Sequence, residues 1–495
     1  MHTDRFTPLD AATLLRWMQH DLPNKQLFGI DRELFFMPKP DDPFRMERYG
    51  KVLETPLGVA AGPHTQLAQN ILSAWLCGAR YIELKTVQVL DELNVAKPCI
   101  DMADEGYNCE WSQELKLDQS FEEYLKAFVL LYVLRDMLNL PVEAEPGKGP
   151  GFIFNMSAGY NLEGIKSPAV QRFLDRMENA EEDVKRIKAG LAPLYPAIEK
   201  MPIPARLSDN LTVSTMHGCP PDEVESIGRY FITERKYNTT IKLNPTLLGP
   251  ERLRDILNTQ LGYDVCVPDE AFGHDLKYND GVAIIRNLAA AAETAGVAFG
   301  LKLTNTLETA NEKQNLPRSE GMVYMSGRSL HPISINLAER LQQEFDGKLD
   351  IAFSAGVDTF NVADTLACGL RPITMSSDIL KPGGYGRLHQ YLDTLRAEMR
   401  KAGAHTIAEW EKSRSPIAGN PGFANLVSYA AAVLGKRSRY HKERFPYVSV
   451  KTERPLPRFD CAAAPCMSGC PAEQDIPRYL DAVARGDFEL AWRVI

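Results

Sequence analysis

Three cysteines lie close together near the end of the chain, in the pattern Cys461-x4-Cys466-x3-Cys470-Pro471. Bacterial iron–sulfur motifs end in the same Cys-x3-Cys-Pro run, and thiolates at this spacing suit iron better than a disulfide. We therefore predict that Cys461, Cys466 and Cys470 are metal ligands and that the protein moves electrons. A 4Fe-4S cluster needs four thiolates. The remaining ligands are expected beyond Ile495 or from another group, unless the cluster is absent from this chain.

Two lysines lie inside short apolar runs, Lys85 in RYIELKT and Lys242 in TTIKLNP. A lysine inside a buried strand is costly unless it is paired or faces a polar ligand. A cation beside the pyrimidine end of a flavin would stabilise the anionic reduced ring, so both lysines are candidate ligands and Lys242 is also a candidate catalytic residue. The alternative is that one of them pairs with a buried carboxylate such as Glu83.

Cys219 is a further candidate, because it lies in the motif HGCPPD (217–222) just before a predicted helix. A thiol at a helix N-terminus ionises readily, so Cys219 could serve as an acid or as a nucleophile. A cysteine packed in a loop fits the sequence equally well, and both interpretations stay open.

These residues belong to a regular alternation of β-type and helical segments. Short apolar runs occupy residues 55–61, 80–86, 151–157, 211–216, 239–245, 297–304, 349–355 and 371–377. Helical patterns lie between or after them, at 66–76, 121–138, 170–187, 222–236, 282–292, 333–343 and 388–400. Strands that alternate with helices imply a parallel sheet, and eight such units imply an α/β protein with a (β/α)8 TIM barrel and insertions. A doubly wound open sheet is the alternative, but no G-x-G-x-x-G motif follows any of the strands.

The chain divides into four predicted parts, which are an N-terminal lead-in (1–50), the barrel (51–402), a helical linker (403–455) and the start of a small α-helical iron–sulfur module (456–495). The linker contains the basic cluster Lys436-Arg437-Ser438-Arg439. We interpret this cluster as a solvated face and not as a binding patch.

In a barrel of this kind the active site lies where the strands end and the following loops begin. The predicted strand ends are polar or rich in small residues, and they include Ala60, Ala61, Gly62, Lys85, Thr86, Asn155, Ser214, Lys242, Lys302, Asn305, Thr306, Gly356, Ser376 and Ser377. A glycine-rich turn (383–386) opens a helix at Arg387. Backbone amides after the last two strands, with the serine hydroxyls, make an anion site suited to a phosphate.

Composition excludes several classes of function. The chain has 495 residues, a net charge of −9 and no basic block, which argues against nucleic acid as the main partner. The N-terminus lacks a signal peptide pattern, and no apolar run reaches the ~18 residues of a membrane span. The other cysteines are scattered, which fits a reducing cytoplasm. His64, His331 and His389 lack metal-ligand spacing, so a metal-dependent hydrolase is disfavoured.

Several of these segments resemble known families. TPLGVAAG followed by IELKTV, with LKLTNT, SAGV and TMSS later in the chain, resembles dihydroorotate dehydrogenase-type flavin barrels. HGCPPDEVESI is similar to the loop that carries the active-site cysteine of dihydropyrimidine dehydrogenase. CAAAPCMSGCPAEQDIPRYL is similar to the start of the iron–sulfur module of that enzyme and of the glutamate synthase small subunit. The order of these parts resembles the bacterial family named for selenate reductase subunits, whose members continue into FAD and NADPH domains.

The resemblance implies FMN in the barrel. It places Ala60, Ala61 and Gly62 against the flavin face, and it places Lys85, Thr86, Asn155, Lys242, Asn305 and Thr306 against the isoalloxazine or the substrate. The ribityl and phosphate groups would be held by Gly327, Gly356, Ser376 and Ser377, and Cys219 would be the proton donor. The chain departs from the families at two positions. Ser214 stands where pyrimidine reductases present an asparagine, and Arg458 stands where a further cysteine is usual.

The function implied is a flavin- and iron–sulfur-dependent oxidoreductase that uses electrons derived from NAD(P)H. Its substrate would be a small conjugated heterocycle, such as a pyrimidine- or purine-type compound, or selenate as the family name implies. The alternative is a non-catalytic electron-transfer subunit of a larger reductase complex. FAD and NADPH would bind only to a longer parent chain or to an electron-donor partner, and the assembly expected is a homodimer or a multi-subunit complex.

Overall fold

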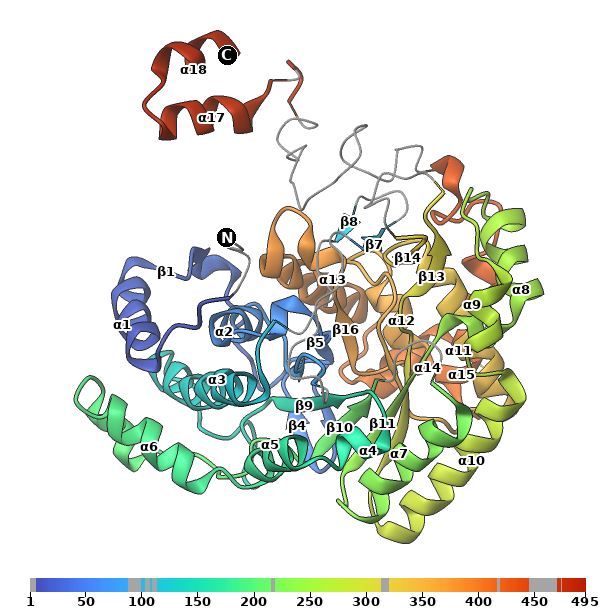
Figure 1. The fold of residues 1–495 in the computed structure, drawn as a ribbon, viewed down its shortest axis with the longest axis horizontal. Helices are drawn as coiled ribbons and strands as arrows, with labels where there is room; N and C mark the ends of the chain where they lie inside the picture. Colours follow the sequence, from blue (N-terminus) through green and yellow to red (C-terminus); the bar gives the residue numbers. More distant parts are fainter. Residues whose placement is uncertain are drawn as a thin grey trace.

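Eight parallel strands form a closed barrel at the centre of the molecule (Figure 1). The computed structural model describes residues 6–87, 99–102, 107–108, 114–214, 219–312, 320–415, 419–444, 470–472 and 474–495. The barrel strands are β5 (Leu57–Val59), β6 (Tyr81–Glu83), β9 (Ile153–Ala158), β10 (Asn210–Val213), β11 (Asn238–Leu243), β12 (Phe299–Leu303), β15 (Ile351–Phe353) and β16 (Ile373–Met375). Their order around the ring is β10-β11-β12-β15-β16-β5-β6-β9.

The eight predicted strands are therefore confirmed, and each strand is shorter than the apolar run that predicted it. Nearly every residue of these strands is buried, as in a parallel sheet that is covered on its outer face by helices. The helices of this outer layer include α2 (Ala68–Leu76), α3 (Leu117–Met137), α7 (Pro221–Thr233), α10 (Tyr278–Ala295), α11 (Leu330–Glu344), α12 (Val362–Ala367) and α13 (Arg387–Lys401). Shorter helices are α4 (Leu162–Ile165), α8 (Pro250–Arg254) and α9 (Asp269–His274).

The single helix expected over 170–187 is wrong, because two helices occupy this segment. They are α5 (Pro168–Glu178) and α6 (Glu181–Leu191). The break lies at Asn179, whose backbone is extended with φ −144° and ψ 98°. The Asn179 side chain accepts a hydrogen bond from the Glu181 amide at 3.2 Å. A local side-chain bond of this kind competes with helical hydrogen bonding.

A second sheet lies over the carboxyl ends of the barrel strands (Figure 1). Its strands are β7 (Ile100–Asp101), β8 (Tyr107–Asn108), β13 (Leu307–Ala310) and β14 (Met322–Met325), in the order β13-β14-β7-β8. This sheet was not predicted, because β7 and β8 are two residues long and β7 pairs with β14, which is far away in the sequence. It brings the insertion after β6 to the mouth of the barrel.

The N-terminal residues form α1 (Ala11–Asp21) and two hairpins, β1–β2 (Gln26–Leu27, Ile30–Asp31) and β3–β4 (Met46–Arg48, Lys51–Leu53). After the barrel, α14 (Ile407–Arg414) and α15 (Pro421–Ala432) pack against α12, and α15 also packs against α11. Two further helices, α17 (Ile476–Ala484) and α18 (Phe488–Val494), pack against each other. In the part of the chain that the structure describes, no helix has both the length and the apolar character needed to cross a bilayer.

Candidate active site

A cleft opens at the carboxyl ends of the barrel strands, where TIM-barrel enzymes place their active sites. Its empty space is about 780 Å³ when counted out to its open mouth. The predicted residues that line this cleft are Ala60, Ala61, Gly62, Lys85, Lys242, Asn305, Thr306, Gly327, Gly356, Ser376 and Ser377. Residues at the ends of six barrel strands (β5, β6, β11, β12, β15 and β16) and after β14 therefore meet around one space.

Thr86, Asn155 and Cys219 are not among the lining residues of the cleft. The Thr86 hydroxyl lies 2.7 Å from the Ser157 hydroxyl, and Asn155 is fully buried and donates to Thr212 at 2.7 Å. Cys219 is half-buried beside the start of α7 and packs against the core. Residues 215–218, which precede it, lie outside the described residues.

The predicted cluster ligands fall mostly outside the described part of the chain. Cys461 and Cys466 lie in a segment that the structure does not describe, whereas Cys470 is described and half-buried. Among the described residues there is no group of three or more His, Cys, Asp or Glu side chains placed to hold a metal ion. The cysteine motif therefore stays a prediction.

A buried ion pair that was not predicted crosses the interior of the barrel below the cleft. The ammonium of Lys302 on β12 contacts the carboxylate of Glu83 on β6, and these two strands stand opposite each other in the ring. Both residues are almost fully buried, and Lys302 also donates to Thr374 at 3.2 Å. Glu83 accepts a further hydrogen bond from the Ala61 amide at 3.1 Å. Glu83 was the right carboxylate to suspect, but its partner is Lys302 and not Lys85 or Lys242.

A sequence signal for this pair existed. Side chains two residues apart on a strand share a face, so Glu83 had to point to the same side as Lys85, and Lys302 to the same side as Thr304. The register places Lys302 opposite Lys242 on the neighbouring strand. The pair was missed because the sequence does not say which strands face each other across the ring.

Lys242 has an ammonium group that is easily deprotonated. Burial is the main reason that the pKa of Lys242 falls to about 7, and the nearby cations Lys302 and Lys85 lower it further while Glu83 opposes the shift. An anion placed in the cleft would raise this pKa and hold the proton on Lys242. Three lysines among the described residues thus line the cleft, and Lys302 is paired with Glu83.

Two glycine loops meet at one side of the cleft. Gly327 has φ +80° and Gly356 has φ +54°, and a Cβ on Gly356 would lie 2.2 Å from the Gly327 carbonyl oxygen. Only glycine at position 356 therefore allows the two loops to approach this closely. The Ser326 hydroxyl, from the first loop, lies 2.9 Å from the Ser377 hydroxyl after β16.

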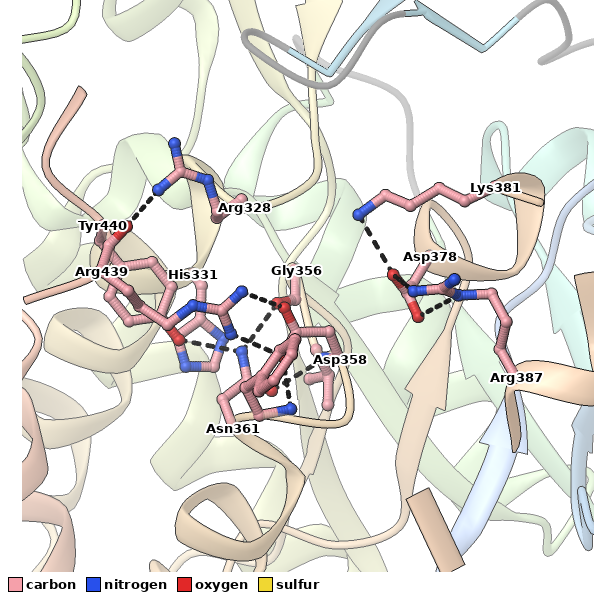
Figure 2. Close-up of polar contacts among 12 residues, drawn as sticks. Arg328, His331, Gly356, Asp358, Asn361, Asp378, Lys381, Arg387, Arg439 and Tyr440 are labelled. Atoms are coloured by element: carbon pink, nitrogen blue, oxygen red, sulfur yellow. Dashed lines mark hydrogen bonds and ion pairs between the residues drawn. The ribbon is translucent and has the colours of Figure 1, made fainter. Parts of the chain in front are cut away.

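Among the described residues that line the cleft, Asp378 is the one carboxylate, and it is held by cations (Figure 2). Arg387 donates to both of its oxygens, at 2.8 and 3.0 Å, and Lys381 lies 3.1 Å away. Burial alone would raise the pKa of Asp378, but Arg387 and Lys381 hold it below its usual value. The charge of Asp378 is therefore balanced by these cations.

The protein family described as "Oxidoreductase YgfK, N-terminal TIM-barrel domain" matches residues 28–417 of this chain. These residues contain the whole barrel and the cleft. The chain belongs to this family. The YgfK proteins of Escherichia coli strain K12 and of strain O157:H7, oxidoreductases by name, are each 41% identical to it over 476 residues. These alignments cover 92% of this chain and 44% of each relative, so the chain spans about half the length of the curated relatives it matches.

Two solved DHODH structures from Eimeria tenella resemble this YgfK-type barrel. The ligand-free structure has a TM-score of 0.44 and 17% identity, and it covers 75% of this chain and 92% of its own. The structure in complex with ferulenol has a TM-score of 0.45 and 15% identity, and it covers 83% of this chain and 98% of its own.

The buried His64, which lies beside the cleft residues Gly62 and Pro63 in the sequence, makes the stability of the YgfK-type barrel depend on pH. Burial lowers the pKa of His64 to about 4, with Lys85 and Lys302 adding to the shift and the Ala60 backbone opposing it. An unfolded histidine takes up its proton near pH 6.5. We therefore expect the free energy of unfolding to fall as the pH drops from about 6.5 to about 4, by at most about 1.4 kcal/mol per pH unit from this residue. Urea denaturation between pH 7 and pH 4 should show this slope.

A His64→Gln variant should flatten that slope, and the exposed His405→Gln substitution is the matched control. The same slope in the wild type and in His64→Gln would contradict a neutral, buried His64. Burial also lowers the pKa of His331 to about 4, so part of the slope is expected to persist in the variant.

Proposed function

We propose that this chain is the FMN-binding, substrate-reducing part of a longer oxidoreductase. The observation that carries the proposal is that one cleft gathers Lys85 and Lys242 together with the loops at Gly327, Gly356 and Ser376–Ser377. The first group suits the electron-rich end of a flavin ring, and the second suits a phosphate. The family description and the relatives' names support an oxidoreductase, and the activity of the longer protein is part of this proposal.

The donors around the cleft fit a flavin mononucleotide. Backbone amides of the two glycine loops and the hydroxyls of Ser326 and Ser377 are the donors that bind phosphate. The Thr306 hydroxyl lines the cleft, is buried and has no hydrogen-bond partner among the described residues. An unpaired buried hydroxyl is costly, which argues for a polar ligand beside it. The lysines that line the cleft suit the negative charge of the phosphate.

FMN, when bound, supplies hydride transfer to a conjugated substrate. The residues of this chain would bind and orient it. Lys85 and Lys242 would stabilise negative charge on the reduced ring, and Lys242 can hold or release a proton near neutral pH because of its lowered pKa. Asn305 and Thr306, which carry an amide and a hydroxyl, line the same space. Cys219 is proposed as the proton donor to the substrate.

The finer parts of the proposal extend beyond the barrel. Electrons would come from NAD(P)H through an FAD-containing partner or a longer parent chain and a 4Fe-4S cluster at Cys461, Cys466 and Cys470. Hydride chemistry favours a pyrimidine- or purine-type heterocycle over selenate, because reduction of an oxyanion usually calls for a transition metal.

The test is an absorption spectrum of the purified chain with FMN and iron quantified per polypeptide. We expect a flavin spectrum and about one FMN per chain, and reduced flavin that a heterocyclic substrate reoxidises under anaerobic conditions. A chain that neither carries nor takes up FMN would refute the proposal. A bound flavin that no small molecule reoxidises would instead support an electron-transfer subunit.

A Cys219→Ser variant tests the proposed proton donor. We expect reoxidation of the flavin by substrate to slow about 100-fold, because general acid catalysis contributes on that order, while reduction of the flavin keeps its wild-type rate. Stopped-flow absorbance measures both half-reactions. The exposed Cys266→Ser substitution is the matched control. Wild-type rates in both half-reactions would show that Cys219 is not the proton donor and only packs in its loop.

A further inference from the structure

The segment that leaves the barrel toward the cysteine motif contacts the two glycine loops of the cleft (Figure 2). Arg439 pairs with Asp358, with both Nη–Oδ distances at 2.7 Å, and Asp358 follows the Gly356 loop. On the other loop, the guanidinium of Arg328 donates to the Arg439 carbonyl oxygen. One residue of this segment therefore contacts both loops. The predicted solvated face is confirmed for Lys436 and Arg437, which are exposed, but it is wrong for Arg439, which is half-buried and paired with Asp358.

The neighbouring Tyr440 is buried and completes this contact. Asn361 donates one amide hydrogen to the Gly356 carbonyl at 3.0 Å and the other to the Tyr440 hydroxyl at 2.9 Å. The Tyr440 ring stacks on the His331 ring, with centroids 5.1 Å apart and an interplanar angle of 13°. The Tyr440 and Tyr429 hydroxyls are 3.3 Å apart.

These groups form a chain of hydrogen bonds in which the donor and acceptor of every bond can be assigned. The Ala355 carbonyl can only accept, so His331 must donate to it from Nδ1, at 2.7 Å. Because burial keeps His331 neutral, its Nε2 accepts from the Tyr429 hydroxyl at 3.0 Å. Tyr429 then accepts from Tyr440, which accepts from Asn361. The chain begins at Asn361, which also holds Gly356, and ends on Ala355, so both anchors lie on the same cleft loop.

We propose that Arg439 and Tyr440 are positioning residues for the phosphate end of the cofactor. They hold the Gly327 and Gly356 loops against each other, so that the loop amides are arranged before a phosphate arrives. This inference rests on the proposed function, since it assumes that the cleft binds FMN. It extends the proposed cofactor-binding site beyond residue 417, where the family match ends. The added residues belong to the segment that continues toward Cys461.

The affinity for FMN compared with that for riboflavin separates positioning from general stability, because riboflavin lacks the phosphate. In Arg439→Gln we expect the Kd for FMN to rise about 10-fold, the usual effect of losing a charge-assisted hydrogen bond, and the Kd for riboflavin to change less than about 2-fold. Tyr440→Phe keeps the ring stack and should raise the Kd for FMN about 5-fold. Arg439→Lys should recover part of the affinity. Flavin fluorescence measures all of these.

The control is Arg414→Gln, which removes an outer ion pair with Asp364 and should leave both affinities unchanged. Equal weakening of FMN and riboflavin in Arg439→Gln, or no weakening of either, would overturn the inference. Hydrogen–deuterium exchange of the Gly327 and Gly356 loops gives a readout without flavin, and faster exchange in Arg439→Gln is expected. Unchanged exchange overturns the positioning role. If the chain binds neither FMN nor riboflavin but exchange is faster in Arg439→Gln, the proposed function and the phosphate role are both refuted. Arg439 would then only stabilise the two loops.

Discussion

A Lys242→Met variant is expected to bind FMN more weakly and to reduce its substrate about 100-fold more slowly than the wild type, the usual effect of removing one group that stabilises developing charge. Methionine keeps most of the length of the side chain and removes the ammonium group, and with it the charge and the proton that the proposal uses. The reduction potential of bound flavin should fall, because the reduced anionic ring loses a neighbouring cation. Flavin content, the potential measured against a reference dye, and the rate of reoxidation by substrate check these three effects.

The matched control for this variant is Lys348→Met, which removes an exposed lysine that precedes β15 and does not line the cleft. It should leave flavin content, potential and rate unchanged. If Lys242→Met also retains all three properties, Lys242 has no role in binding the flavin, and the anionic end of the ligand must be held by other groups of the cleft.

A Glu83→Gln variant is expected to lose about 3 kcal/mol or more of unfolding free energy, because it leaves the Lys302 ammonium buried without a counter-charge. The double variant Glu83→Gln with Lys302→Met should recover most of this loss, since removing both charges also removes the cost of burying them. Urea denaturation of the wild type, both single variants and the double variant gives the coupling energy directly.

An exposed pair provides the comparison for this cycle. Glu182→Gln removes the surface contact between Glu182 and Lys185, and it should change the unfolding free energy by less than about 1 kcal/mol. If the double variant is as unstable as Glu83→Gln alone, the instability comes from something other than the unpaired charge, such as a carboxamide NH2 group that faces the Ala61 amide in place of an acceptor.

Both predictions depend on how the charges of the cleft are divided. Glu83 neutralises Lys302, and Arg387 with Lys381 neutralises Asp378. The positive charge of Lys242 is therefore not cancelled by either carboxylate. For this reason we expect an anion to bind in the cleft even though the chain as a whole carries a net charge of −9.

The sequence by itself determined the barrel fold and the end of the barrel at which the candidate site lies. Eight apolar runs that alternate with helical patterns can bury their strands on both faces only in a parallel sheet, and the polar residues at their ends must then meet at one edge. Lys85, Lys242, Asn305 and Gly356 were found in this way. Local information was sufficient because strand periodicity decides which side chains face inward.

Only the tertiary structure decided which of these residues are partners. The Glu83–Lys302 pair spans the ring, the second sheet joins β7 to β14, and Arg439 reaches both glycine loops from outside the barrel. The same reason removes Thr86 and Asn155 from the lining, since their hydrogen bonds to Ser157 and Thr212 depend on neighbouring strands. Strand order and long-range packing determine these contacts, and no short stretch of sequence records which distant segments will meet.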